Sequence, residues 1–480
     1  MLSRELTLCV KEHNHSFAVF NNYNTDLFMA WTYEIFHELS QIRNQSTYVF
    51  DLSNSGYDYQ VSFLSRFFRE MQRMLCFGRS RHSRVTAPPR ISKWVNTVLV
   101  FPKFLHILLE IIKCRNMTNF LITTHFDEYL RKSVHSTVAG YIGSVEYSIY
   151  PNLLNIARTL LSYLVVFKTT DDQLKDTFFC EVFIANGRIV NSAATAAAVR
   201  NLGIRTTIIE RGARPGKFEL FNYSPHSADE RRSQLQHTWV KTDLLERERI
   251  AQEYIDLRRN VDPISGVTWT RNMSLGALPK FDSRKLCVIY TSTELEFAVF
   301  GDSIPHGSFP TQREAVKALI DALSPDDWQV FVRRHPYKTK VRKDPEKRNW
   351  EFLSLYPNVV EIPPDSPVDS YALGQVANLV AHYDSSIGPE LIATQKTHVI
   401  SIGNVFWENP DSRYLINSHQ RMESADFTKL SVRNIQDIYP WALYMSTFGK
   451  DFSKSRWINS QSFIAGKRIV EKPISHWLGK

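Results

Sequence analysis

Side chains that bind phosphate follow three apolar runs in the second half of the sequence. The loops concerned are 291–293, 333–338 and 385–386. Hydroxyl, imidazole and guanidinium groups donate hydrogen bonds to phosphate oxygens. The predicted phosphate-binding residues are Ser292, Thr293, Arg334, His335, Ser385 and Ser386. Because the carboxyl ends of parallel strands meet at one edge of a sheet, these loops predict a site for a nucleotide mono- or diphosphate.

Glu390 lies in the first turn of a helix that the sequence predicts from Pro389 to Thr394. Proline suits the first helical position, because its missing N–H has no partner there. From this position the carboxylate could reach a ribose hydroxyl of the nucleotide. The alternative is a carboxylate that only interacts with the positive end of the helix dipole.

Glu210 is the candidate for proton transfer. It follows the predicted buried strand Arg205–Ile209, and Gly212 two residues later allows a close approach of backbone or ligand. A carboxylate beside a cleft can act as a general base on an acceptor hydroxyl. The neighbouring Arg211 favours the alternative, a structural acid held in an ion pair.

Asn186 and Arg188 follow the preceding predicted strand, Val182–Ala185. A predicted Ala-rich helix, Ala193–Leu202, connects this strand to the next one, as in a βαβ unit. The ends of both strands should therefore lie at the same edge of a parallel sheet. Asn186 and Arg188 are predicted to contact the acceptor of the reaction.

Strands and helices alternate regularly from residue 284 onward. The predicted strands are 286–290, 328–332, 359–362, 378–382 and 397–402, and the predicted helices are 311–323, 345–355, 368–375 and 389–394. This alternation is typical of a doubly wound Rossmann-like α/β domain. The predicted domains are 1–275, 276–410 and a C-terminal segment, 411–480, that packs back across both. Residues 61–113 are predicted to form a basic amphipathic insertion in the first domain.

The composition indicates a soluble globular protein, with 43% hydrophobic and 22% charged residues in a chain of 480. Its 58 basic and 49 acidic residues give a net charge of +9, which suits an anionic ligand or an anionic membrane surface. Nucleic acid is not an expected partner, because aromatic and basic residues do not interleave along any predicted strand. Five scattered cysteines and an N-terminus without a signal sequence predict a cytoplasmic protein with reduced thiols.

The basic segment 61–113 could attach the protein to the inner face of a membrane. The alternative is a core-facing helix with a solvated basic side. The most apolar stretch, 94–112, is interrupted by Pro102, Lys103, His106 and Glu110. It is therefore not expected to cross a bilayer.

The pairs His335-Pro336 and Ser385-Ser386 resemble the HP and S(S/T) motifs of bacterial sialyltransferases and of the related Kdo and polysialic acid transferases. Glu210-Arg211-Gly212 is similar to the acidic-x-glycine motif that carries their catalytic base, although Arg211 stands where a second acid is usual. Together with 186–188 and 224–226, these residues also resemble capsule polysaccharide biosynthesis proteins. The resemblance implies a GT-B fold, with two Rossmann-like domains facing each other across a cleft.

The same resemblance implies a metal-independent glycosyltransferase without a cofactor. Its donor would be a nucleotide-sugar, first of all a CMP-activated sialic acid or Kdo. Its acceptor would be a glycan or glycolipid of capsule or lipopolysaccharide synthesis. Two alternatives stay open: the same fold using a UDP- or GDP-sugar or CDP-glycerol, and a non-catalytic component of capsule assembly or export.

Overall fold

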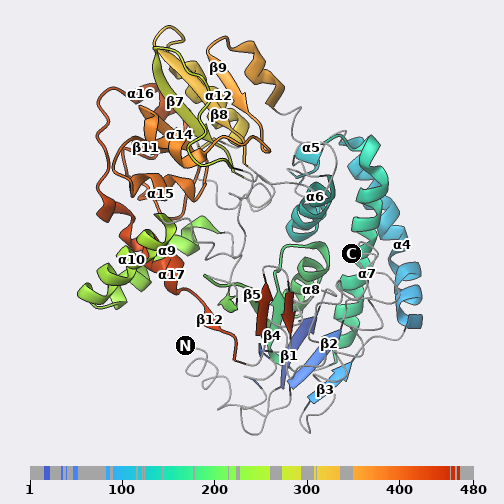
Figure 1. Cartoon of the computed structure of the whole chain (residues 1–480). Coiled ribbons are helices and arrows are strands. Elements are labelled where there is room, and N and C mark those ends of the chain that lie inside the picture. Colours follow the sequence, from blue (N-terminus) through green and yellow to red (C-terminus); the bar gives the residue numbers. More distant parts are fainter. Residues whose placement is uncertain are drawn as a thin grey trace. The chain divides into compact units, whose positions relative to one another are not determined.

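The structure of the protein is a computed structural model of the whole chain (Figure 1). It describes residues 16–21, 34–35, 39, 47–51, 83–86, 90–114, 117–121, 123, 125–142, 145, 147–176, 179–213, 216–222, 227–259, 273–292, 308–309, 311–335, 350–453, 456–459 and 462–464. The chain divides into two compact units. Unit 1 comprises Met1–Tyr141, Glu146–Pro225 and Gly449–Lys480, and unit 2 comprises Ile142–Val145 and His226–Phe448.

Unit 1 is built on a seven-stranded sheet with the strand order β12-β6-β5-β4-β1-β2-β3. The strands are β1 (Ser16–Asn21), β2 (Thr47–Asp51), β3 (Ser83–Thr86), β4 (Phe179–Ala185), β5 (Arg205–Arg211), β6 (Lys217–Phe221) and β12 (Lys450–Asp451). The strands from β5 to β3 are parallel, and β6 is antiparallel to both of its neighbours, β5 and β12. Because β3 pairs with β2, residues 83–86 belong to the sheet of unit 1 and not to an insertion. A two-stranded sheet, β13 (Arg456–Asn459) and β14 (Ser462–Ile464), completes the unit.

The helices of unit 1 are α4 (Arg90–Lys113), α5 (Met117–Leu121), α6 (Glu128–Ile142), η1 (Tyr150–Asn152), α7 (Leu153–Leu174) and α8 (Val190–Asn201). The connection α8 joins β4 to β5, as the sequence predicts. Most of its residues are small, and nearly all are buried. Small side chains let α8 pack closely against α7, which in turn packs against α4.

Unit 2 contains a five-stranded parallel sheet with the order β11-β10-β7-β8-β9. The strands are β7 (Lys285–Tyr290), β8 (Trp328–Arg333), β9 (Val359–Ile362), β10 (Leu379–His382) and β11 (His398–Ser401). The chain builds outward from β7 to β9 and then returns to the other side of β7. The sheet therefore has its topological switch point between β7 and β10. The predicted Rossmann-like domain is confirmed, and its core strands are apolar runs buried on both faces.

Helices cover both faces of this sheet. They are α9 (Ala228–Lys241), α10 (Leu244–Arg259), α12 (Gln312–Ala322), η3 (Glu351–Leu355), α14 (Ser370–Val376), α15 (Ile387–Ile392), α16 (His419–Ser424), η4 (Ile435–Ile438) and α17 (Tyr439–Thr447). One apolar cluster joins α12 and α16 to the sheet, and another joins α10, α14, α15 and α17 to it.

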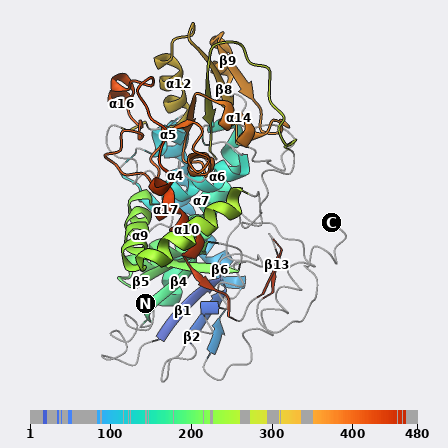
Figure 2. The same ribbon diagram turned by 60° about the vertical axis from the view of Figure 1, so that its left-hand side comes forward.

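The boundary predicted at residue 275 is wrong, because the chain passes from unit 1 to unit 2 after Pro225. The helices α9 and α10 pack against α17, and Figure 2 shows the three side by side. Tyr254 of α10 and Trp441 of α17 meet edge to face, with 5.6 Å between the ring centres. The predicted C-terminal segment is divided at residue 448: α16 and α17 belong to unit 2, and β12 pairs with β6 in unit 1.

Candidate functional site

Two of the predicted phosphate-binding loops meet at the switch point of unit 2. The loop after β7 contains Ser292, and the loop after β10 contains Ser385 and Ser386. The Ser292 hydroxyl donates to the backbone oxygen of Asp384 across 3.4 Å. Asp384 has a φ of 49°, a left-handed conformation that non-glycine residues seldom adopt and that is frequent at functional turns. The two loops are thus in contact, and Ser386 beside this contact is exposed.

The third loop joins the same edge through His335. Its backbone N–H donates to the Thr291 hydroxyl oxygen at 2.8 Å. Burial, together with the charge of Arg333, lowers the pKa of the His335 imidazole to about 4. At neutral pH the ring is therefore uncharged. It can offer one N–H to a phosphate, but no positive charge.

The arginines beside His335 are buried and hold the structure of unit 2 together. Arg334 Nη1 lies 3.1 Å from Glu361 Oε1. Arg333 donates to the Ser370 hydroxyl at 3.3 Å and to the backbone oxygens of Pro363 and Ser366. These contacts differ from the phosphate contact predicted for Arg334. Predicted residue Thr293 lies outside the described residues.

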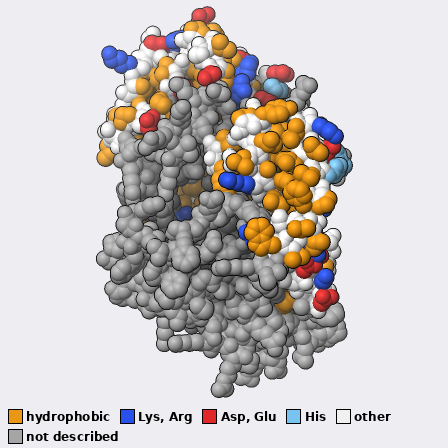
Figure 3. Space-filling view, turned by 90° about the vertical axis from the view of Figure 1, so that its right-hand side faces the viewer, with side chains coloured by type: hydrophobic (Ala, Val, Ile, Leu, Met, Phe, Trp, Pro, Cys, Tyr) orange, Lys and Arg blue, Asp and Glu red, His pale blue; other side chains and the backbone are white. Residues whose placement is uncertain are grey.

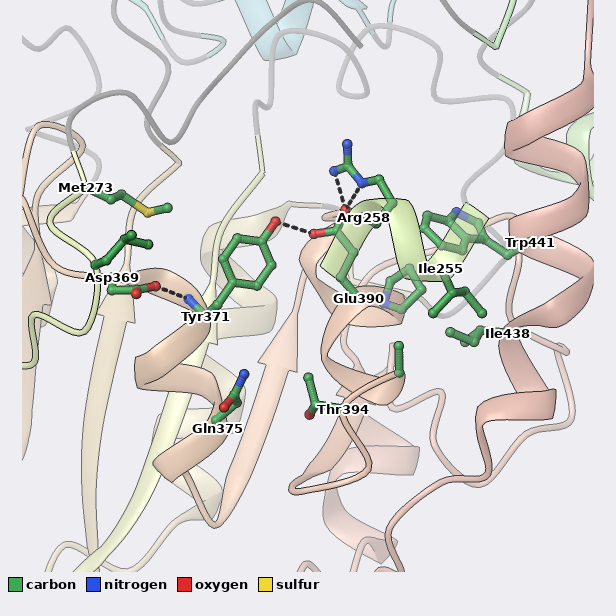
Figure 4. Close-up of a pocket in the computed structure, with 13 residues that line it drawn as sticks. Ile255, Arg258, Met273, Asp369, Tyr371, Gln375, Glu390, Thr394, Ile438 and Trp441 are labelled. Carbon is green, nitrogen blue, oxygen red and sulfur yellow. Dashed lines mark hydrogen bonds and ion pairs between the residues drawn. The ribbon is translucent and has the colours of Figure 1, made fainter. Parts of the chain in front are cut away.

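Glu390 faces a cavity of about 220 Å³ that is lined by residues of α10, α14, α15 and α17 (Figure 4). Its carboxylate accepts hydrogen bonds from Arg258 Nε at 2.8 Å and from the Tyr371 hydroxyl at 2.6 Å. Burial raises the pKa of Tyr371, and the charge of Glu390 raises it further. Because the carboxylate has protein partners, a ribose hydroxyl would have to share or displace them. The apolar side of the cavity includes Ile255 and Trp441.

In unit 1, the ends of β4 and β5 lie side by side, as predicted. Asn186 Nδ2 donates to Glu210 Oε2 at 2.8 Å, and the N–H of Arg211 donates to Glu210 Oε1 at 3.0 Å. The side-chain oxygen of Asn186 accepts from the N–H groups of Arg188 and Ile189. An oxygen that accepts two N–H groups fixes the amide orientation and turns its NH₂ group toward Glu210. Asn186 therefore positions Glu210, which differs from its predicted contact with the acceptor; Arg188 is half-buried in the same turn.

Two glycines permit this arrangement. Gly187 has a φ of 66°, and a Cβ there would lie 2.9 Å from Ile208 Cδ1. A Cβ at Gly212 would lie 2.8 Å from that of Lys217. The close approach expected at Gly212 is thus made by β6, the next strand of the hairpin.

Glu219 is a carboxylate that the sequence analysis missed. It lies directly opposite Glu210 in the antiparallel pair of β5 and β6, so both side chains are on the same face of the sheet. Burial raises the pKa of Glu219, although the N–H groups of Leu220 and Gly449 act in the opposite direction. The alternation Lys-Phe-Glu-Leu-Phe in 217–221 is the signal that could have revealed this strand.

A buried polar network below the switch point was also missed. His382 Nε2 lies 3.0 Å from the Ser401 hydroxyl, which also contacts Glu408, and Glu408 pairs with Arg433 at 2.6 Å. All four residues are buried. The network ties the end of β10 to the chain after β11, so it supports the loop that carries Ser385 and Ser386.

No family model matches the sequence, and no curated protein matches it. Among solved structures, the chain is similar to KpsC, a beta Kdo 2,4 transferase of Thermosulfurimonas dismutans, at 14% identity over 55% of this chain and 80% of that one, with a TM-score of 0.37. It is similar to the UDP-GlcNAc 2-epimerase of Neisseria meningitidis bound to UDP-GlcNAc at 13% identity over 90% and 94%, with a TM-score of 0.27. It is also similar to the MnaA–UDP structure of S. aureus at 10% identity over 91% and 93%, with a TM-score of 0.24. Superpositions with such scores do not establish a family, and the function must be inferred from the residues of this chain.

Proposed function

We propose that the protein is a glycosyltransferase that moves a sugar from a nucleotide-sugar to a glycan. The observation that carries the proposal is the convergence of three loops at the switch point of unit 2. The Ser292 hydroxyl contacts the loop of Ser385 and Ser386. The backbone N–H of His335 donates a hydrogen bond to the hydroxyl of Thr291, the residue before Ser292. Open parallel sheets bind nucleotides at this place, outside the carboxyl ends of the strands.

The donor phosphate would accept hydrogen bonds from these hydroxyls and from the His335 N–H. Glu210 would take the proton of the acceptor hydroxyl while the oxygen of that hydroxyl forms a bond to the anomeric carbon of the sugar. The bond between that carbon and the phosphate oxygen breaks, and the nucleotide leaves with the electron pair. Donors at the leaving oxygen stabilise the charge that develops there.

The charges of the side chains at this edge of the unit 2 sheet support a CMP-sugar as the donor. His335 is neutral, Arg334 is paired with Glu361, and Arg333 binds backbone oxygens. A CMP-sugar has a single phosphate with one negative charge, whereas a UDP- or GDP-sugar has two phosphates with one negative charge each. The described residues of these loops therefore offer one uncompensated cation, the buried Arg333, beside neutral donors, and this suits the smaller charge. A UDP- or GDP-sugar or CDP-glycerol is the alternative donor class.

Nucleotide binding is tested by calorimetry and by thermal shift with CMP, CDP, UMP, UDP and GDP. A ligand that binds only the folded state raises the melting temperature. We expect CMP to bind the protein, and Ser385→Ala/Ser386→Ala to weaken binding by roughly tenfold or more, the scale of one or two hydrogen bonds to a charged group. Ser424→Ala, an exposed serine of α16, is the matched control and should bind CMP normally. Absence of binding by all five nucleotides would refute the donor site.

Catalysis is tested separately with Glu210→Gln. This variant keeps the size of the side chain but removes the base. We expect roughly a 100-fold or greater loss of sugar transfer with unchanged CMP binding, the usual scale for a general base. If transfer stays at the wild-type rate, Glu210 is not the base. If wild-type protein binds nucleotide but transfers no sugar to any acceptor glycan tested, a non-catalytic role is favoured.

A further inference from the structure

The outer side of α4 carries a row of exposed apolar side chains. The row consists of Trp94, Val98, Phe101, Leu105 and Leu109, and we call it the α4 outer face. Residues three or four apart lie on the same side of a helix. Trp94 is 69% and Val98 is 72% exposed. Figure 3 shows hydrophobic side chains gathered on this side of unit 1, and apolar patches of this kind mark interaction sites.

The opposite side of α4 already forms part of the core of unit 1. Its buried residues are Val100, Phe104, Ile107 and Ile111. This side packs against α7, where Asn96 Nδ2 donates to the Thr169 hydroxyl at 3.0 Å. Core packing therefore explains one apolar side of the helix and leaves the α4 outer face unexplained.

By length and composition α4 could cross a membrane. Its stretch from Lys93 to Lys113 has a mean hydropathy of 1.7, and it is the one such helix found among the described residues. Crossing a bilayer would expose the buried side of the helix and break the bond between Asn96 and Thr169. It would also place Lys103 in the middle of the hydrocarbon. A helix that is packed into a folded unit on one side can instead lie along a membrane with the other.

The charges of α4 indicate which surface it fits. The helix contains the basic residues Arg90, Lys93, Lys103 and Lys113 and the acidic residue Glu110. Lys103 and Lys113 are exposed, and the whole chain has a net charge of +9. Lysine and tryptophan side chains are favoured in the headgroup region, where the amine meets anionic lipid and the ring lies at the apolar boundary.

We propose that unit 1 binds the surface of an anionic membrane through the α4 outer face, with α4 parallel to the surface. The apolar row would enter the boundary between headgroups and acyl chains, and the basic residues near the two ends of the helix would bind the headgroup phosphates. This function is independent of the proposed transferase reaction, because it uses neither Glu210 nor the loops of unit 2.

The test is flotation of the full chain with vesicles of phosphatidylcholine alone or with added phosphatidylglycerol. We expect binding to the anionic vesicles, weakened by high salt. Val98→Gln/Leu105→Gln/Leu109→Gln should reduce partitioning by roughly 100-fold, because three side chains no longer favour the apolar boundary. Lys113→Gln should reduce it by roughly fivefold.

Val240→Gln/Leu245→Gln is the matched control in unit 2, where these side chains are 76% and 77% exposed. It should float like the wild type. All substituted positions are exposed, so circular dichroism should show unchanged folding in each variant. Equal flotation of the α4 variant and the wild type would overturn the proposal, as would wild-type protein that stays at the bottom at low salt. A wild-type dimer that the α4 variant loses, without vesicle binding, would show that the face binds a second copy instead.

Discussion

Arg258→Met should destabilise unit 2, because it leaves the Glu390 carboxylate buried without its cation. The Glu390 side chain is 5% exposed and that of Arg258 is 21% exposed. Removing one partner of a buried ion pair costs about 3–5 kcal/mol of unfolding free energy. We expect about 3 kcal/mol, the lower end, because Arg258 retains some contact with water and Tyr371 still donates to the carboxylate.

The second variant, Arg258→Met/Glu390→Gln, removes the charge as well as its partner. It should regain most of the lost stability, because a neutral amide is much less costly to bury than an unpaired carboxylate. The assay is urea unfolding followed by circular dichroism, with the slope of the transition checked for each variant. Arg249→Met is the control from the same helix: Arg249 is exposed and pairs with Glu246 and Glu253, so its loss should have no measurable effect.

Equal stability of Arg258→Met and Arg249→Met would refute the reasoning, since the pair could then contribute nothing to the fold. Failure of Glu390→Gln to rescue Arg258→Met would show that arginine packing, and not charge, is responsible. The same variants bear on nucleotide binding. If Glu390 binds a ribose hydroxyl, Glu390→Gln should weaken CMP binding even where stability is restored.

Two further predictions concern the buried network at the end of β10. Gly388→Ala would place a Cβ 2.3 Å from His382 Nε2 and should lower the free energy of unfolding in urea by about 1–3 kcal/mol, the scale of overpacking a core. Gly140→Ala is the control, because a Cβ there meets no atom within 4 Å and should not change the stability. Equal losses of stability in the two variants would contradict the packing argument. Burial, aided by the charge of Arg433, lowers the pKa of His382 from 6.5 to about 3, so between these pH values the unfolded state binds the proton and stability should fall as the pH decreases. His382→Asn should reduce that pH dependence, and an unchanged slope would show that other groups cause it.

The sequence predicts the strands of unit 2 well because a buried parallel strand is a short, nearly continuous apolar run. Leu379–His382 is one example, and the serines after it fall at the edge that the topology dictates. The domain boundary was missed because α9 and α10 are strongly charged. Only a few residues, such as Leu235 and Ile255, are buried, and their partners on α17 are nearly two hundred residues away.

The pairing of charged side chains could not be predicted for the same reason. Glu390 meets Arg258 from 132 residues away, and Arg334 meets Glu361 from the next strand. The sequence locates a carboxylate or a guanidinium at a strand end, but sequence spacing does not indicate which partner neutralises it. Asn186 and Glu210 are an exception, because consecutive strands of a βαβ unit lie side by side.

These pairings have a chemical consequence for the donor site. A loop with two arginines and a histidine suggests, from its sequence, a strongly positive phosphate site. In the structure Arg334 is neutralised by Glu361, His335 is held as a neutral imidazole, and Arg333 is buried with its guanidinium on backbone oxygens. Hydroxyls and N–H groups can bind a monophosphate such as CMP well, but a diphosphate such as UDP has more negative charge and gains more from cations. The ratio of the CMP affinity to the UDP affinity therefore tests whether the described residues account for the charge of the site. Tighter binding of UDP would require cationic side chains beyond those described in these loops.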